Sequence, residues 1–174
     1  MSFFSLKNKL VAVPLKYGFI GGGMVILLFL IFYFMDINPL VNIKMVDAFI
    51  LAIFIFFSLK EFRDQYNNRK LHFWQGMTGG IMNYLTIAVI SAIFIFVMTV
   101  IIDPELTTKF IENSIALLNE NKQTLIEEMD EATFQEAMTG VSETTGFDLA
   151  LDDFLKKSII GLFLTIIISV ILRK

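Results

Sequence analysis

Long apolar segments without charge constrain this chain more than any other feature of its sequence. The longest, residues 73–102, carries no charged side chain over 30 positions. A helix needs about 20 apolar residues to cross the hydrocarbon core of a bilayer. We therefore expect a membrane-spanning helix over 73–102 that tilts or extends beyond the core.

Two further segments fit a membrane crossing by length and composition. Residues 17–35 are uncharged and follow Lys16. This apolar run is of full length and ends in no recognisable cleavage site, so we expect the span to be retained. Residues 154–172 form the last predicted span, which reaches a plausible length when Lys156 and Lys157 lie at the interface.

The remaining predicted span, residues 43–62, is less regular. Lys44, Asp47 and Lys60 fall in its end turns, where long basic side chains can extend to the membrane surface. We expect Asp47 to lie near the interface and to be hydrated. A buried or interfacial helix is the alternative for this segment.

The composition also indicates a membrane protein. Hydrophobic residues make up 56% of the chain and charged residues 18%, whereas soluble domains contain about 45–50% and about 25%. A chain of 174 residues cannot hide that much apolar surface inside one water-soluble particle. The sequence therefore predicts an all-α polytopic membrane protein with four transmembrane helices in a single domain over 1–174.

Several classes of site are excluded by residue counts. The chain has no cysteine and one histidine, which excludes disulfides, thiolate ligands, iron–sulfur clusters and multi-histidine metal sites. Its net charge of −3 provides no general attraction to nucleic acid. We expect no catalytic residue, no metal and no cofactor, and a protein that is not an enzyme.

A few polar residues could carry chemistry, but each has a simpler structural interpretation. His72 precedes Trp74, and the pair is typical of an aromatic anchor at the membrane interface. Asp152 and Asp153 could act as paired carboxylates, although a solvated helix start before the last span explains them more simply. The run of glycines at 21–23 lies inside a hydrophobic segment, so it is not a phosphate-binding loop.

Basic residues near the ends of the spans predict the orientation. Nine lysines and arginines fall on the side of both termini and the loop between spans two and three, against five on the other side. Because cytoplasmic loops are enriched in basic residues, we place both termini in the cytoplasm, with the protein in a bacterial inner membrane. The predicted interface and topology residues are Lys16, Lys60, Arg63, Arg69, Lys70, Trp74, Arg173 and Lys174.

Residues 103–153, between the third and fourth spans, form an acidic zone. With Lys156 and Lys157 included, this region holds 13 of the 17 carboxylates and four lysines. The calcium-loop motif is missing from it. We expect an extracytoplasmic helical hairpin that forms a solvated cap on the bundle, with apolar faces that pack on each other or on a partner protein.

The pattern within this zone predicts two helices. An Asp-Pro-Glu start and apolar residues at helical spacing predict a helix over 104–119. A second is predicted over 122–139, with Gly140 as the residue that ends it and a loop over 141–148.

Small residues spaced four apart predict close packing between helices. We interpret them as an intramolecular seam, with a homo-oligomer contact as the alternative. Asn83 at membrane depth needs a hydrogen bond to another helix, and a polar lining for a pore or ligand site is its functional alternative. The predicted packing residues are Gly18, Gly22, Gly76, Gly80, Asn83, Ser91 and Gly161.

The order of several motifs resembles a known family. Phe62-Arg63-Asp64 is followed by Phe73-Trp74-Gln75-Gly76 at the start of the longest apolar run, and Ile102-Asp103-Pro104-Glu105 follows that run. The acidic stretch at 130–136 and the final apolar run ending in Leu172-Arg173-Lys174 complete the pattern. Over residues 15–174 the chain resembles the bacterial membrane family catalogued as domain of unknown function 4199, seen mostly in Bacteroidota. The resemblance implies four spans and an extracytoplasmic hairpin, and it brings no catalytic residues.

The sequence favours a non-enzymatic accessory or assembly subunit of an envelope complex, whose partners are the lipid bilayer and a membrane protein or a second copy. The alternative is a small transporter or channel that acts as an oligomer. A membrane enzyme with a site around His72 and the neighbouring basic residues is the least favoured class, because those charges are explained by topology.

Overall fold

The computed structural model of the chain describes residues 3–42 and 44–173. Two predicted positions, Ile43 at the start of the second span and the topology residue Lys174, lie outside the described residues. The side chains of residues 3–8, 42, 44–45 and 129 are likewise not described. Within the described part every regular element is a helix, which confirms the predicted all-α class.

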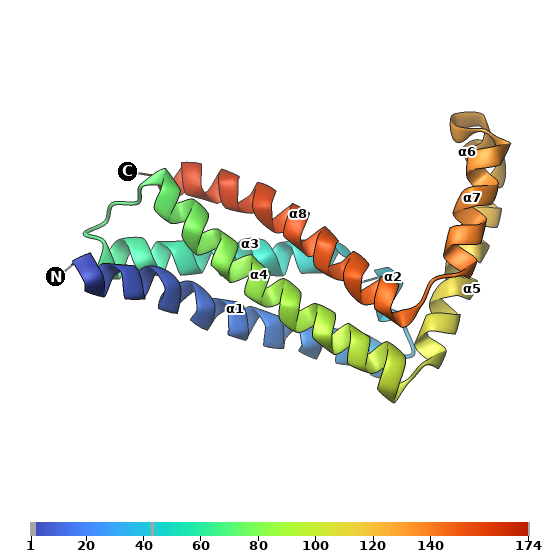
Figure 1. Cartoon of the computed structure of the whole chain (residues 1–174), viewed down its shortest axis with the longest axis horizontal. Helices are drawn as coiled ribbons and strands as arrows, with labels where there is room; N and C mark the ends of the chain where they lie inside the picture. Colours follow the sequence, from blue (N-terminus) through green and yellow to red (C-terminus); the bar gives the residue numbers. More distant parts are fainter. Residues whose placement is uncertain (1–2, 43, 174) are drawn as a thin grey trace.

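Four long helices form a bundle (Figure 1). They are α1 (Phe3–Phe34), α3 (Lys44–Glu61), α4 (Phe73–Val97) and α8 (Gly146–Leu172), and α2 (Pro39–Asn42) is a single turn between the first two. Neighbours in the chain run in opposite directions, so that both ends of the described chain lie together (Figure 1). We name this end of the bundle the terminus end, and the opposite end the arm end.

Two of the long helices continue into short π-helices. α3 leads into η1 (Phe62–Tyr66) at the terminus end, and α4 leads into η2 (Met98–Ile102) at the arm end. After η2 the chain leaves the bundle as three consecutive helices, α5 (Glu105–Glu120), α6 (Lys122–Met129) and α7 (Glu131–Ser142). These three helices, which we name the arm, extend away from the bundle (Figure 1).

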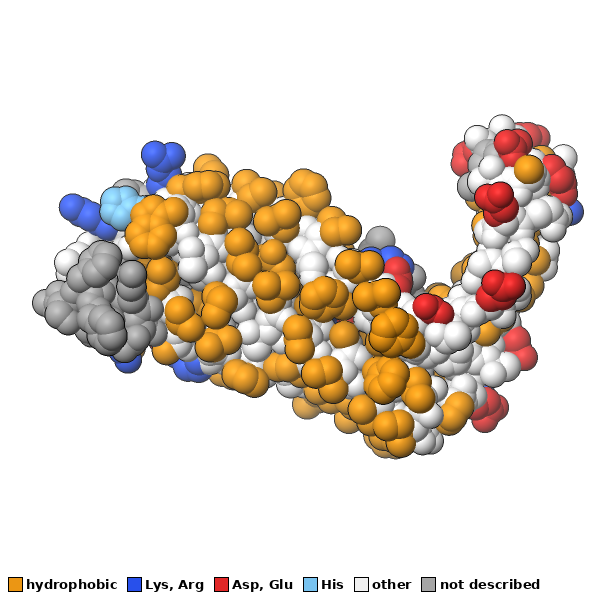
Figure 2. Space-filling view, in the orientation of Figure 1, with side chains coloured by type: hydrophobic (Ala, Val, Ile, Leu, Met, Phe, Trp, Pro, Cys, Tyr) orange, Lys and Arg blue, Asp and Glu red, His pale blue; other side chains and the backbone are white. Residues whose placement is uncertain are grey.

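The face of the bundle seen in Figure 2 is covered largely by apolar side chains along its length. Within residues 3–42 and 44–173, three helical stretches are long and apolar enough to cross a membrane: Lys9–Phe34, Phe73–Ile102 and Gly146–Leu172. They expose large hydrophobic side chains on the surface of the bundle, which suits contact with lipid tails rather than water. Among the most exposed are Phe19, Phe34, Ile93, Phe163 and Ile171.

α3 is not one of these three stretches, because its 18 residues include Lys44, Asp47, Lys60 and Glu61. It nevertheless lies inside the bundle and packs against α1, α4 and α8. The face of α3 that packs in the bundle includes Leu51, whose side chain has no exposed surface. The segment predicted as the second span is therefore a helix, Lys44–Glu61, that packs in the bundle.

Several predicted boundaries were wrong at the arm end. α8 begins at Gly146 and not at 154, because Thr145 and Asp148 form a capping box that starts the helix earlier. The predicted loop over 141–148 is reduced to the residues between α7 and α8. Gly140 does not end a helix, since α7 continues past it to Ser142.

The predicted helix over 122–139 is two helices. Asp130 lies between α6 and α7 with φ 72°, a conformation that breaks an α-helix. Its carboxylate accepts a hydrogen bond from the backbone N–H of Thr133 at 2.8 Å and so caps α7. The capping residue Asp130 therefore divides the segment predicted as one helix into α6 and α7.

Candidate functional site

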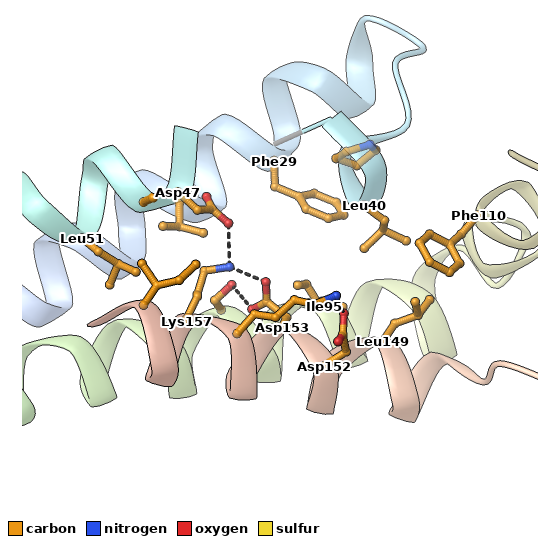
Figure 3. A pocket seen from close by; sticks show the side chains of 16 residues that line it. Phe29, Leu40, Asp47, Leu51, Ile95, Phe110, Leu149, Asp152, Asp153 and Lys157 are labelled. Atoms are coloured by element: carbon orange, nitrogen blue, oxygen red, sulfur yellow. Dashed lines mark hydrogen bonds and ion pairs between the residues drawn. The ribbon is translucent and has the colours of Figure 1, made fainter. Parts of the chain in front are cut away.

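A cluster of charged side chains lies inside the bundle, toward the arm end. Lys157 of α8 places its Nζ 2.6 Å from Asp47 Oδ2 of α3, and it also pairs with Asp153 one turn earlier on α8. Ser91 of α4 donates a hydrogen bond of 2.8 Å to Asp153 Oδ2. Figure 3 shows Asp47 and Asp153 on either side of the Lys157 ammonium. We name Asp47, Asp153, Lys157 and Ser91 the charge cluster.

The charge cluster is buried. The side chain of Lys157 is 4% exposed, that of Asp47 14% and that of Asp153 18%. At about 1.5 Å of rise per residue, Lys157 lies roughly 16 Å from the start of α8 and roughly 22 Å from its end. Exposed apolar side chains flank it on both sides along α8, at Phe147 and Ile171. The cluster thus lies between apolar stretches of α8, beside the half-exposed pair Asp152–Lys156.

This geometry corrects three expectations from the sequence. Asp47 was expected to be hydrated near the interface; its side chain is 14% exposed, pairs with Lys157 and lines the cavity described below. Asp152 and Asp153 were expected at a solvated helix start, but α8 starts earlier and Asp153 faces the bundle interior. Lys157 was expected at the interface, yet it is almost fully enclosed. Each polar group is tolerated there because it has a partner of opposite charge.

The charge cluster contains more carboxylate than ammonium. Its two carboxylates share the single Nζ of Lys157, and the neighbouring pair Lys156–Asp152 is neutral in itself. One oxygen, Asp47 Oδ1, is buried and has no hydrogen-bond partner among the described residues. An unpaired negative charge at this depth is costly unless a proton or another cation neutralises it.

A cavity of about 90 Å³ adjoins the charge cluster. Its walls are mainly apolar, and Phe110 of the arm lies at its outer side together with Leu40 of α2 (Figure 3). Asp152 and Lys156 line it as well, and both side chains are about half exposed. Since one water molecule needs about 10–15 Å³, this space admits several. The remaining apolar walls are formed by Val25, Phe29, Leu51, Ile95, Leu149 and Ile160.

A second group of polar side chains lies toward the terminus end. Lys16 Nζ is 2.7 Å from Glu61 Oε1, and the Tyr17 hydroxyl donates to Glu61 Oε2 at 2.8 Å. These bonds join α1 to the end of α3. Glu61 was not singled out from the sequence, where Lys16 was read only as a topology residue.

The other predicted topology residues lie at the terminus end without forming one site. Arg63 Nε donates to Asp64 Oδ1 at 2.7 Å, and this hydrogen bond lowers the pKa of the Asp64 carboxyl. Lys60 lies over the ring of Phe56, and Trp74 is 56% exposed at the start of α4. The remaining described members, Arg69, Lys70 and Arg173, are exposed.

The predicted packing residues of α4 and α8 face each other. A Cβ added at Gly80 would lie 2.3 Å from Thr165 Cγ2, and one at Gly76 would lie 2.5 Å from Ser169 Oγ. On the other side of the same contact, Gly161 lies against the ring of Tyr84. The two helices approach this closely because these positions lack side chains.

The predicted packing residues of α1 face α4. Gly18 lies against Thr86, and Gly22 lies against Ile90. Asn83 is fully buried and donates a hydrogen bond of 3.1 Å from Nδ2 to the Pro14 carbonyl oxygen of α1. The structure therefore brings these residues together as contacts between helices, whereas Ser91 belongs to the charge cluster.

The charge cluster was not predicted as a site from the sequence. The spacing of Asp153 and Lys157, one helical turn apart in an apolar segment, was the available signal. The third member, Asp47, comes from a helix more than a hundred positions away in the sequence, so its part in the cluster required the fold.

The charge cluster can hold or exchange a charge. Among the described residues no three His, Cys, Asp or Glu side chains are grouped to hold a metal ion. Its one hydroxyl, Ser91 Oγ, donates to a carboxylate rather than to a basic nitrogen, so it is not set up as an activated nucleophile.

Comparison with known proteins agrees with the resemblance noted in the sequence. A family model described as "Protein of unknown function (DUF4199)" matches residues 16–174. No curated protein and no solved structure matches the chain.

Proposed function

Because this chain belongs to the DUF4199 family, whose function is unknown, we propose a role from its own geometry. We propose that it is a non-enzymatic integral membrane protein of the cell envelope, which acts as an accessory or assembly subunit and binds another protein through the arm. The observation that carries this proposal is the arm itself, an acidic three-helix element that extends away from an apolar bundle (Figures 1 and 2).

Four membrane crossings are part of the proposal, with α3 as the second. α1 ends at the arm end and α4 begins at the terminus end (Figure 1), so the chain must return between them. α3 makes that return inside the bundle. Two of its charged side chains have partners there, Asp47 with Lys157 and Glu61 with Lys16, which reduces the cost of placing them at membrane depth.

The excess of basic residues at the terminus end supports an orientation with both termini in the cytoplasm. The arm then lies on the outer side of a bacterial inner membrane. Residues 105–142 contain eight carboxylates and two lysines, so the arm is repelled by anionic lipid headgroups. This charge favours an arm that stands away from the membrane surface.

The arm offers a surface that fits a partner helix. A shallow groove between α5 and α7 is lined mostly by apolar side chains, among them Leu118, Leu125 and Val141. Leu117 lies in this groove and is 49% exposed. Since acidic residues surround an apolar strip, the complementary partner is an amphipathic helix with basic residues beside its apolar face.

Purification from native membranes in a mild detergent tests this function. The wild-type chain should carry a stoichiometric partner, which Leu117→Arg should lose because it places a charge in the groove. The matched control Ala116→Arg adds the same charge at an exposed position of α5 outside the groove, and it should retain the partner. A wild-type chain that purifies alone as a monodisperse monomer would contradict the proposal.

A small transporter or channel is the second candidate, and the charge cluster with its cavity favours it. Intramembrane ionisable residues often mark ion or substrate pathways. Flux measured in reconstituted vesicles tests this candidate with Asp47→Asn and Asn83→Leu. Loss of flux in the first variant would support it, whereas a wild-type protein without flux would remove it.

A further inference from the structure

We propose that the charge cluster is a binding site for one proton, held by Asp47 and reached by water from the arm end only. This inference goes beyond the proposed partner binding and does not depend on it.

Asp47 and the described side chains that face it carry one more negative than positive charge when all are ionised. From α8, Asp153 and Lys157 contact the cluster, and Asp152 and Lys156 stand beside the cavity. α4 contributes only the hydroxyl of Ser91. α1, α2 and α5 contribute apolar side chains to the cavity, including Phe29, Leu40 and Phe110. On α3 itself, Lys44 lies one turn before Asp47, and its side chain is outside the described residues.

A proton fits the enclosed oxygen better than a larger ion does. Asp47 Oδ2 is taken by the Lys157 ammonium at 2.6 Å, and Oδ1 has less than 1 Å² of accessible surface. No described donor reaches Oδ1, and no metal-binding group of carboxylates surrounds it. Removal from water favours the neutral form of a carboxyl group. Protonation of Asp47 turns two carboxylates and one ammonium into a neutral set.

The cavity provides the path for this proton. It is large enough for several water molecules, and the half-exposed pair Asp152–Lys156 lies at its edge. A hydronium ion in the cavity can therefore transfer a proton to the Asp47 carboxylate at the cavity wall. One O–H bond of the hydronium breaks, one O–H bond forms on the carboxyl group, and a neutral water molecule is left.

The bundle is closed on the opposite side of the charge cluster. Leu51, Ile55 and Ile87 have no exposed surface and separate the cluster from the terminus end. Among the described residues, Lys157 is the only acidic or basic side chain that is almost fully buried, and the buried polar side chains toward the terminus end, including Ser58, Asn83, Thr165 and Ser169, carry only hydroxyl or amide groups. The site therefore binds a proton from one side of the membrane without conducting it to the other.

Infrared spectroscopy of the full-length protein in micelles of dodecyl maltoside, a detergent without carbonyl groups, tests the proposal. Near neutral pH, where exposed carboxyl groups with a pKa of about 4 are ionised, the wild type should show the carbonyl band of one protonated carboxylic acid. Asp47→Asn should lose this band. The control Asp64→Asn, which removes a surface carboxyl at the terminus end, should keep it.

Further results of the same infrared measurement support or overturn the proposed proton site. Asp47→Glu should keep a band at a shifted frequency, so the proposal remains testable if Asp47→Asn does not fold. The proposal is overturned if the wild type shows no such band at any pH above the range in which exposed carboxyl groups titrate. Retention of the band in Asp47→Asn also overturns the proposal, because the proton would then lie on another group. Loss of the wild-type band when sodium chloride replaces choline chloride at constant pH overturns it as well, because a metal cation would then displace the proton.

Discussion

At the scale of residues, Lys157 has the largest expected effect, because its buried ammonium contacts carboxyl groups on two helices at once. Replacing it in Lys157→Met leaves Asp47 and Asp153 buried without an ammonium. Removing one partner of a buried ion pair costs about 3–5 kcal/mol, and we expect a loss of that size in the free energy of unfolding at neutral pH. The loss should shrink as the pH falls, since protonated carboxyl groups need no counter-charge. Equilibrium unfolding in detergent micelles measures both effects.

The neighbouring lysine provides the control. Lys156 also pairs with an aspartate one turn earlier, Asp152, but both side chains are about half exposed. Lys156→Met should therefore cost about 0–1 kcal/mol. Equal losses in the two variants would mean that the charge cluster is far wetter than its burial indicates.

Residue types could be read from the sequence, but their surroundings could not. The i,i+4 spacing of Asp153 and Lys157 is visible in the printed sequence, and the need of Asn83 for an interhelical partner follows from its place in an apolar run. The partners themselves, Asp47 for Lys157 and Pro14 for Asn83, come from helices distant in sequence. Only the packing of the bundle decides which polar groups meet.

At the scale of elements, the α4–α8 contact depends on glycine. Gly80→Ala places a Cβ 2.3 Å from Thr165 Cγ2, a separation that real side chains do not reach. The Thr165 side chain or the helices must shift, so we expect a loss of about 1–3 kcal/mol in the free energy of unfolding. Thermal unfolding in detergent, monitored by circular dichroism, measures it.

Gly23 is the matched control for this substitution. It lies in α1, and an added Cβ there meets nothing within 4 Å. Gly23→Ala should leave stability unchanged or raise it slightly, because alanine is the better helix former. A second change, Thr165→Ala in the Gly80→Ala background, should recover part of the loss. If Gly23→Ala costs as much as Gly80→Ala, close packing at Thr165 is not the cause.

The arm shows how far helix boundaries follow from local sequence. The start of α5 was predicted within one residue from its Asp-Pro-Glu sequence, whereas the break at Asp130 was missed. Asp130 sits in a stretch whose apolar spacing continues on both sides, so periodicity gave no reason to divide it. The break follows from the capping hydrogen bond, which depends on backbone angles rather than on pattern.

This cap predicts a pH dependence at the start of α7. The backbone N–H of Thr133 lowers the pKa of the Asp130 carboxyl, so the ionised form stabilises the fold. The stabilisation is complete above the pKa of the unfolded chain, about 3.9, and is lost as the pH falls through the lower folded value. Hydrogen exchange at the Thr133 amide should accelerate in Asp130→Ala and remain slow in Asp130→Asn, whose side chain can still accept the bond. Unchanged protection in Asp130→Ala would refute the cap.

At the scale of the whole molecule, the cavity is lined by residues of both the bundle and the arm, which were predicted from the sequence as separate parts. Phe110 of the arm and Phe29 of α1 both line it, next to the charge cluster (Figure 3). Leu106, near the base of the arm, is buried in the same apolar cluster as Ile95 and Leu149. A change of charge at Asp47 therefore occurs beside the contact that holds the arm on the bundle.

Membrane topology is the prediction that the whole account depends on, and the absence of cysteine from the chain makes it directly measurable. Single cysteines can be placed in the arm by Glu127→Cys, between α1 and α2 by Met35→Cys, and in η1 by Gln65→Cys. In intact spheroplasts a membrane-impermeant maleimide should label the first two and spare the third, which should react only after permeabilisation. Labelling of Gln65→Cys alone would invert the orientation, and labelling of Met35→Cys and Gln65→Cys from the same side would mean that α3 does not cross the bilayer.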